Sequence, residues 1–180
     1  MATPQARRVE VLRTHLELRE LDGLRPAAAP LADVTLTREG LGADAYRELY
    51  AAVGERWHWR DRLLLGDEEL AAYLASADVH VWVLRTEGSA AGYFELQRHP
   101  DARVEIMYFG LMPAYIGRGL GGWMLTRAVE EAFALGVSRV TLHTCTLDSP
   151  AALPNYLARG FSIVRREQYV ETVEPNGRVD

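Results

Sequence analysis

Lysine is absent from this sequence of 180 residues, and all 20 of its basic side chains are arginines. Without a lysine amine the protein cannot form a Schiff base with a carbonyl substrate or attach pyridoxal phosphate. The chain also lacks the Gly-Lys-Ser/Thr sequence on which a Walker A phosphate loop depends. Three common kinds of catalytic or nucleotide site are therefore excluded.

Cysteine is almost absent too, because Cys145 is the single cysteine of the chain. One cysteine excludes an intrachain disulfide and a cysteine-rich metal site. The five histidines do not follow the spacing of metal ligands. We therefore expect no metal in this protein.

Long apolar runs are missing as well, since none approaches the roughly 20 residues that cross a bilayer. The N-terminal sequence MATPQARRVEV has positive charge without an apolar segment behind it, unlike a secretory signal. A net charge of −5 also argues against general binding to nucleic acids, which needs clustered positive charge. The sequence thus predicts a cytoplasmic protein that binds neither membranes nor nucleic acids.

The composition that remains is typical of a folded globular domain, with 48% hydrophobic and 25% charged residues. The length fits one domain over residues 1–180. Apolar residues that alternate with polar ones predict strands around Leu16 and Leu36. Helical spacing of apolar residues predicts helices over 43–53 and 67–76.

The second half of the chain has a regular order of elements. Strand-like runs at 79–86, 90–97 and 103–112 are joined by short turns, which predicts an antiparallel meander. A helix to about Leu135, a strand over 139–145, a short helix and a last strand follow. This order predicts an α+β (mixed α/β) fold with one central sheet and helices on both faces.

Glycines gather where the strand 103–112 meets the next helix, at Gly117, Gly119, Gly121 and Gly122. Glycines allow successive backbone N–H groups to point into one concavity, and a helix start adds its positive dipole end. Such an arrangement most often holds a phosphate. The alternative is a tight turn whose glycines serve close packing.

Two motifs within residues 104–161 resemble the GNAT superfamily of acetyltransferases, which bind acetyl-CoA. Ile116-Gly117-Arg118-Gly119-Leu120-Gly121 is similar to the family's pyrophosphate loop, Gln/Arg-x-x-Gly-x-Gly/Ala, except at Ile116. The family's second motif is Asn-x-x-Ala-x-x-Leu-Tyr-x-x-x-Gly-Phe. This chain matches it at Ala152, Tyr156, Gly160 and Phe161, with Ser149 in place of the asparagine and Asn155 in place of the leucine.

The resemblance implies a GNAT-like single domain with a mostly antiparallel sheet, in which one pair of parallel strands is splayed. It implies an extra N-terminal strand and loop at 1–30, acceptor-side helices and the meander at 31–100, and an acetyl-CoA-binding core at 101–165. The family's oxyanion donors are backbone N–H groups near Leu111 and Met112. The residues that the resemblance assigns to acetyl-CoA are Leu111, Met112, Ile116, Gly117, Arg118, Gly119, Leu120, Gly121, Gly122 and Ser149.

The resemblance also implies the catalytic groups. Tyr156 occupies the family position whose hydroxyl lies near the CoA sulfur, which suits a general acid. Glu105 stands where several family members have a catalytic glutamate, and its apolar neighbours predict burial, which raises a carboxyl pKa toward that of a useful base. Three alternatives stay open: an ion pair of Glu105 with Arg103 or His143, a base at Glu95, and ordered water.

The expected function is acetyl transfer from acetyl-CoA to a primary amine of a small molecule by direct attack, and the resemblance allows a homodimer. The aromatic and charged cluster over 57–62 predicts either an acceptor pocket or a loop closed by two core tryptophans. The predicted acceptor residues are Trp57, Trp59, Arg60, Tyr108 and His143. Two other functions stay open: a non-catalytic acyl-CoA sensor, which Ile116 and Ser149 would allow, and transfer of a longer acyl group or to a hydroxyl.

Overall fold

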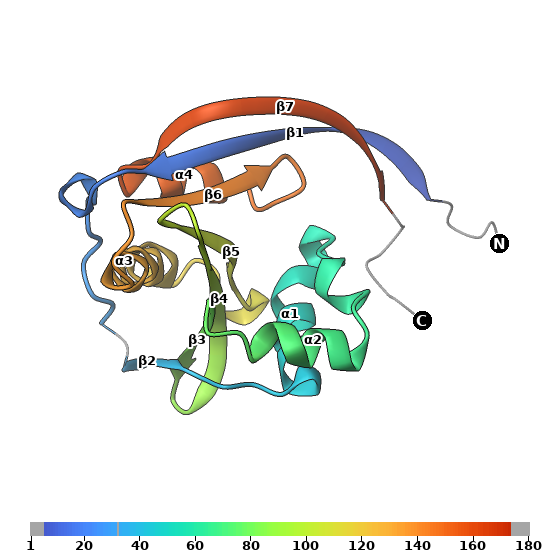
Figure 1. Cartoon of the computed structure of the whole chain (residues 1–180), viewed down its shortest axis with the longest axis horizontal. Helices are drawn as coiled ribbons and strands as arrows, with labels where there is room; N and C mark the ends of the chain where they lie inside the picture. The colour runs from blue at the N-terminus through green and yellow to red at the C-terminus, as the bar shows by residue number, and fades with distance from the viewer. Residues whose placement is uncertain (1–5, 32, 174–180) are drawn as a thin grey trace.

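A computed structural model describes residues 6–31 and 33–173 of the chain (Figure 1). The strands of the described residues are β1 (Arg7–Leu18), β2 (Val34–Arg38), β3 (Val79–Thr86), β4 (Ser89–His99), β5 (Arg103–Leu111), β6 (Arg139–Cys145) and β7 (Ser162–Val173). The α-helices are α1 (Ala43–Gly54), α2 (Asp67–Leu74), α3 (Leu120–Ala134) and α4 (Ala152–Ala158). Short 3-10 turns are η1 (Leu21–Gly23), η2 (Glu55–Trp57), η3 (Asp61–Leu63) and η4 (Pro113–Tyr115). Within these ranges, no helix has the length and apolar character needed to cross a membrane.

In the described part of the chain the strands form one seven-stranded sheet in the order β2-β3-β4-β5-β6-β1-β7. The strands β3, β4 and β5 pair in antiparallel fashion, which confirms the predicted meander. The pair β5 and β6 is parallel, and every other pairing in the sheet is antiparallel. The predicted mixed α/β domain with a mostly antiparallel sheet is confirmed.

The parallel strands β5 and β6 separate soon after they meet. Their register runs only from Arg103 opposite Arg139 to Glu105 opposite Thr141. Just beyond, β5 carries an extra residue, because Glu95 faces Tyr108, Leu96 faces Ile106, and Met107 is left without a partner on β4. Such a bulge bends and twists a strand locally. The split predicted from the family resemblance is therefore present, and it opens beside the bulge.

Helices cover both faces of the sheet, as predicted (Figure 1). Helices α1 and α2 pack on β3 and β4 through a core that includes Tyr46, Leu70 and Tyr93, all fully buried. Helices α3 and α4 pack on the other face around Met124 and Phe94. The bulge in β5 directs Tyr108 to the first core, whereas Phe109 and Leu111 belong to the second.

The N-terminal strand β1 lies inside the sheet, between β6 and β7, and not at an edge. From Arg7 to Leu12 it pairs with β7 alone, and from Arg13 onward it pairs with β6 as well. The first part of β1 and the last part of β7 therefore form a two-stranded ribbon that arches past the rest of the sheet (Figure 1). The sequence predicts the strand around Leu16 but gives no sign of this interior position.

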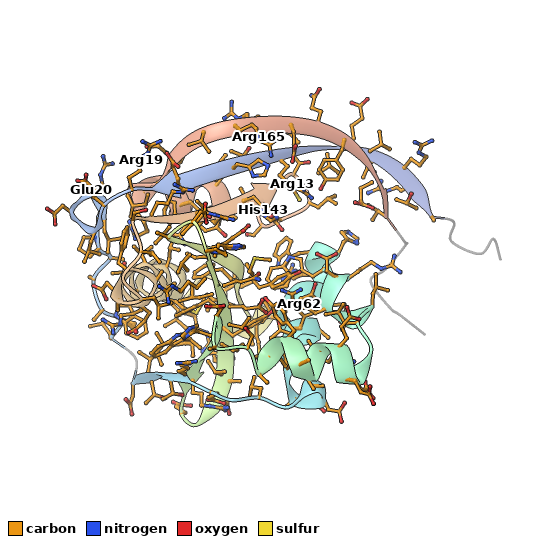
Figure 2. The ribbon with its side chains drawn as sticks, viewed as in Figure 1. Arg13, Arg19, Glu20, Arg62, His143 and Arg165 are labelled. Carbon is orange, nitrogen blue, oxygen red and sulfur yellow. The ribbon has the colours of Figure 1, made fainter. Side chains whose placement is uncertain are left out.

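A buried ion pair holds the α1–α2 layer to the sheet. Glu95 on β4 is fully buried, and its carboxylate accepts hydrogen bonds from the hydroxyls of Tyr46 and Tyr73 and from Arg62, at 2.7 Å. The Arg62 guanidinium also lies over the Tyr73 ring, 4.1 Å from its centroid, and points in among the helices (Figure 2). Glu95, one of the alternatives for a catalytic base, thus ties the helices to β4.

Replacing Arg62 by methionine should destabilise the protein by about 3 kcal/mol, because the buried Glu95 carboxylate loses its only countercharge within bonding distance among the described residues. Urea unfolding at pH 7 measures the change. The matched control is Arg47→Met, which removes a cation whose partners Asp44 and Asp67 are exposed, and should cost under about 1 kcal/mol. Equal losses of unfolding free energy in the two variants would show that the buried ion pair contributes no more to stability than the exposed one.

Candidate functional site

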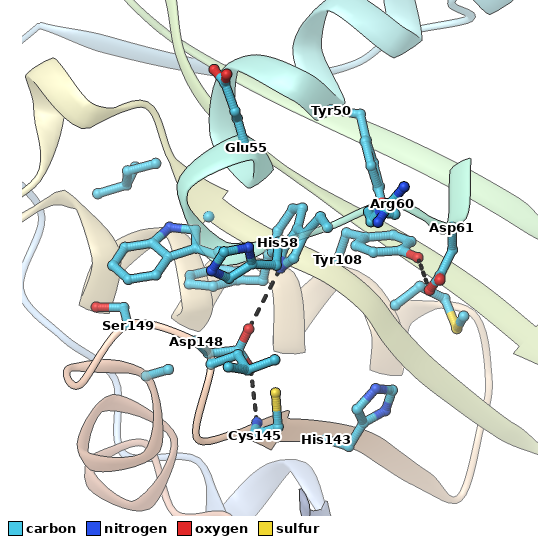
Figure 3. Close-up of a pocket in the computed structure, with 18 of the residues that line it drawn as sticks. Tyr50, Glu55, His58, Arg60, Asp61, Tyr108, His143, Cys145, Asp148 and Ser149 are labelled. Carbon is cyan, nitrogen blue, oxygen red and sulfur yellow. Dashed lines mark hydrogen bonds between the residues drawn. The ribbon is translucent and has the colours of Figure 1, made fainter. Parts of the chain in front are cut away.

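A cavity of about 960 Å³ opens at the split between β5 and β6 (Figure 3). One wall comes from α1 and the turns η2 and η3, and a second from β5. The opposite side comes from β6, the loop to α4 and α4 itself, with the start of α3 at one end and the β1–β7 ribbon at the other. The cavity therefore joins the glycine-rich loop to the aromatic cluster, two features that lie far apart in the sequence.

The glycine-rich loop at the start of α3 has the geometry of a phosphate cradle. Gly117 and Gly119 have φ angles of 82° and 75°, a left-handed conformation that favours glycine. Gly119 caps α3 without a side-chain hydrogen bond, and the first turn of the helix carries no acidic residue. The first N–H groups of α3 thus remain open to a ligand. Ile116, Gly117, Gly121 and Gly122 line the cavity.

Four of the residues assigned to acetyl-CoA do not line the cavity: Met112, Arg118, Gly119 and Leu120. The Leu120 side chain is 2% exposed and belongs to the core under α3, so only its backbone could meet a phosphate. The Arg118 guanidinium lies over the Tyr115 ring, 5.2 Å from its centroid. Ser149, by contrast, does line the cavity, on the loop before α4.

The end of β5 offers one of the two predicted oxyanion donors. The Met112 N–H donates to the Ala91 carbonyl at 2.8 Å, so the expectation that it is free for a ligand is wrong. Backbone N–H groups of a strand point alternately to its two neighbours. The N–H of Leu111 therefore points toward the side where β6 has separated, and Leu111 lines the cavity.

Tyr156 lies on α4 at the inner side of the cavity and is 6% exposed. Its ring packs edge-on against Phe109 and Phe161, with centroids 6.2 Å apart in each case. Burial, together with the nearby Asp148 carboxylate, raises the pKa of the Tyr156 hydroxyl above its ordinary value. The hydroxyl therefore keeps its proton at neutral pH. Among the described residues, no protein group forms a hydrogen bond with it.

Asp148 links the two sides of the cavity, although sequence reasoning assigned no specific role to it. One carboxylate oxygen accepts hydrogen bonds from the Thr144 hydroxyl at 2.7 Å and the Cys145 N–H at 2.8 Å. The other accepts a long bond of 3.5 Å from the Trp59 indole N–H (Figure 3). This contact links the loop after β6 to Trp59 on the opposite side of the cavity. No sequence signal reveals such a contact between segments 89 positions apart.

Trp57, Trp59 and Arg60, the predicted acceptor residues of the cluster over 57–62, line the cavity together with Tyr108 of β5, and these residues form its aromatic wall. The Tyr108 hydroxyl donates to Asp61 at 3.0 Å (Figure 3). Between the two tryptophans, His58 adopts a left-handed backbone with a φ angle of 60°, which is strained for a non-glycine residue. The cluster therefore lines a cavity, while Trp59 also packs against the α1–α2 core, and the binding of an acceptor there stays a prediction.

The β1–β7 ribbon supplies a part of the wall that sequence reasoning missed. Tyr169, Glu171 and Val173 of β7 line the cavity together with Arg13 of β1. The Arg13 guanidinium donates to the Tyr169 hydroxyl at 3.2 Å and lies over its ring. Because β1 and β7 are more than 140 positions apart in the chain, local patterns do not predict their pairing.

Glu105 differs from its predicted environment. It does not line the cavity, and its carboxylate lies 2.9 Å from Arg103 and 3.4 Å from His143. Burial pushes its pKa up, but the hydrogen bonds to His143 and Arg103 outweigh burial, so the pKa lies below its ordinary value. The expectation of a raised pKa is therefore wrong, and the ion pair with Arg103 is present, with the His143 ring beside the same carboxylate. His143, predicted on the acceptor side, does line the cavity.

The profile of the acetyltransferase (GNAT) family matches residues 43–161, and the chain belongs to that family. The resemblance predicted from the two motifs is confirmed. A curated relative is the mycothiol acetyltransferase of Corynebacterium efficiens, 27% identical over 165 residues. The match covers 84% of this chain and 54% of the relative, so the chain spans about half the length of that protein.

Solved structures share the fold. A GCN5-related N-acetyltransferase from Kribbella flavida has a TM-score of 0.64 and 17% identity, covering 92% of this chain and 59% of that one. An IAA acetyltransferase from Bacillus cereus has a TM-score of 0.56 and 24% identity, covering 74% and 79%. The fold of the described residues is thus that of known GNAT proteins.

Glu105→Gln should lower the melting temperature more at pH 7 than at pH 3. Because the folded-state pKa of Glu105 is depressed, its charge stabilises the fold above the unfolded pKa of about 4.3, and this stability is lost as the pH falls. Thermal unfolding of both proteins at the two pH values measures the difference. A decrease of equal size at both pH values would instead indicate lost packing.

Proposed function

We propose that this protein is an acetyl-CoA-dependent N-acetyltransferase that acetylates a primary amine of a small molecule by direct attack. The observation that carries the proposal is the single cavity that runs from the phosphate-cradling loop, through the split between β5 and β6, to an aromatic wall. The name of the Corynebacterium relative assigns acetyl transfer to that protein, which supports the class of reaction.

The cofactor side of the cavity would receive the two halves of acetyl-CoA. The N–H groups at the start of α3 would hold the pyrophosphate, and the split would take the extended pantetheine arm. Acetyl-CoA supplies an acetyl group that is already activated as a thioester. The N–H of Leu111 would then stabilise the negative charge that develops on the thioester oxygen.

Tyr156 would act as the general acid. Its hydroxyl keeps its proton at neutral pH, has no protein hydrogen-bond partner among the described residues, and lies in the cavity between the loop and the aromatic wall. A hydroxyl in this state can donate to the thiolate that leaves when the C–S bond breaks. The same acid would serve a hydroxyl acceptor, and the charge of the acceptor side argues for an amine.

The acceptor side of the cavity is acidic. The cavity as a whole is lined by more acidic than basic side chains. The four carboxylates are Glu55, Asp61, Asp148 and Glu171, and the two arginines are Arg13 and Arg60. An excess of negative charge raises the local concentration of a protonated amine. The surrounding Trp57, Trp59 and Tyr108 offer apolar contact area to the remainder of a small molecule.

Gly119→Asp should abolish measurable CoA binding, because the side chain adds a like charge at the phosphate cradle and forces a non-glycine residue into a φ angle of 75°. Calorimetric titration with CoA measures the affinity. Gly40→Asp is the matched control, since Gly40 has open space around it and lies outside the cavity. Unchanged affinity in a folded Gly119→Asp variant would contradict the assignment of the loop.

Tyr156→Phe should lower kcat by about 100-fold, the usual contribution of a positioned acid, while the affinity for CoA stays near the wild-type value. The buried ring contacts with Phe109 and Phe161 are retained in this variant, so the fold should be unaffected. Thiol release from acetyl-CoA in the presence of an amine measures kcat. If kcat is unchanged and the chemical step limits the rate, Tyr156 is a packing residue only.

A further inference from the structure

We infer that His143 accepts the proton of the acceptor amine and that Glu105, which the resemblance made the base, acts as the positioning residue behind it. The inference rests on the proposed function and adds a catalytic group to it. Three observations support it: the contacts of the Glu105 carboxylate, the position of His143 in the cavity, and the hydrogen bonds that other cavity acids already accept from the protein.

Both oxygens of the Glu105 carboxylate are engaged within the sheet. Oε2 lies 2.9 Å from Arg103 and 3.4 Å from His99, while Oε1 lies 3.4 Å from Nδ1 of His143. The side chain is 19% exposed and does not reach the cavity. A carboxylate in this position can fix an imidazole but cannot itself meet a substrate.

His143 stands between that carboxylate and the cavity. It lies on β6, two residues beyond Thr141, where the register with β5 ends, and its side chain is 37% exposed. Figure 3 shows it on the cavity side of β6. Among the described residues, no protein group hydrogen-bonds its Nε2.

With Glu105 ionised, the neutral imidazole of His143 is favoured in the tautomer that carries its proton on Nδ1. Nε2 is then the unprotonated atom and can accept a proton from a ligand. The same arrangement stabilises the imidazolium that forms, since its positive charge lies beside the Glu105 carboxylate.

Several other charged groups surround His143. His15 lies directly opposite on β1, with ring centroids 5.8 Å apart, and it is itself paired with Glu167 and Arg165 of β7. Other ionisable side chains on the neighbouring strands include Arg13 and Glu17 of β1, His99 of β4, Arg103 and Tyr108 of β5, and Cys145 of β6. The Glu105 carboxylate is the group within bonding distance of His143.

The other acids and bases of the cavity are less suited to take the proton. Asp61 accepts the Tyr108 hydroxyl, and Asp148 accepts three hydrogen bonds. Glu55 and Glu171 are exposed, as is His143, but among the described residues neither glutamate has a side-chain partner that would orient it. His58 has no carboxylate partner among the described residues that would orient it. His143 alone combines a place in the cavity with a carboxylate behind its ring.

The step conserves protons and charge. The protonated acceptor amine passes one proton to Nε2 of His143, and its nitrogen then forms the C–N bond with the thioester carbonyl. The C–S bond breaks with its electron pair going to sulfur, and the thiolate takes the proton of Tyr156. The second nitrogen proton is released as the amide forms and restores the Tyr156 hydroxyl through solvent, while His143 returns its proton to solvent.

The test compares kcat/KM across pH 6 to 9.5 for the wild type, His143→Asn and His99→Asn, with acetyl-CoA and the most active amine from a panel of alkylamines, amino sugars and amino acid amides. Asparagine can still donate to Glu105 from its amide but cannot accept the proton. We expect His143→Asn to lose about 100-fold at neutral pH. The deficit should shrink toward pH 9.5, as free amine with a pKa near 10 accumulates without help.

His99→Asn is the matched control, because His99 touches the same carboxylate but does not line the cavity. It should stay within about twofold of the wild type across the pH range, whereas a base contributes at least about 100-fold. Equal losses in both histidine variants would overturn the inference and indicate a structural network.

The role of Glu105 has a separate readout. In ¹⁵N spectra of histidine-labelled protein at pH 8, the wild type should show His143 protonated on Nδ1, and Glu105→Gln should reduce that tautomer and lower kcat/KM with unchanged KM for acetyl-CoA. A His143 ring protonated on Nε2 in the wild type would overturn the inference.

The outcomes separate this inference from the proposed function. If the wild type releases thiol only when an amine is present, the proposed function holds. A wild-type pH profile in His143→Asn then overturns the inference alone. If the wild type releases no thiol with any amine of the panel, the proposed function fails and the inference fails with it.

Discussion

The separation of two parallel strands is the constraint on which the rest of this structure depends. Strands β5 and β6 are paired only as far as Glu105 and Thr141, and beyond that point their facing backbone groups have no partner on the other strand. Unpaired groups of this kind are costly if buried without water or a ligand. The cavity that opens there resolves the conflict, since it gives the Leu111 N–H a space that a substrate can fill.

The bulge at Met107 determines which side chains of β5 face each side of the sheet. Because one residue is added to β5, Tyr108 faces the aromatic wall and the α1–α2 core, while Phe109 and Leu111 face α3 and α4. In the proposed function, the same sheet would present polar and aromatic groups to an acceptor on one side and backbone groups to an acyl donor on the other. Asp148 joins the two sides through its contact with Trp59.

Local patterns predicted the elements and the turn of the glycine-rich loop well, because strands 79–86 and 139–145 alternate in hydrophobicity and Gly117 and Gly119 adopt left-handed angles. They could not predict what depends on pairing between distant segments. The interior place of β1, the cavity wall formed by β7, and the partners of Glu105 all arise from strands that meet only in the folded sheet. The apolar neighbours of Glu105 correctly indicated burial, but its pKa is governed by Arg103 and His143, which lie beside it in space.

A crystal structure of the protein with CoA tests the central claim most directly. The claim is that the split between β5 and β6 joins a phosphate-binding loop at the start of α3 to an acceptor site at the aromatic wall. The account predicts the pyrophosphate against the N–H groups at the start of α3, the pantetheine arm along Leu111 in the split, and the sulfur near the Tyr156 hydroxyl. A CoA molecule bound elsewhere on the sheet, with the split closed by side chains, would contradict it.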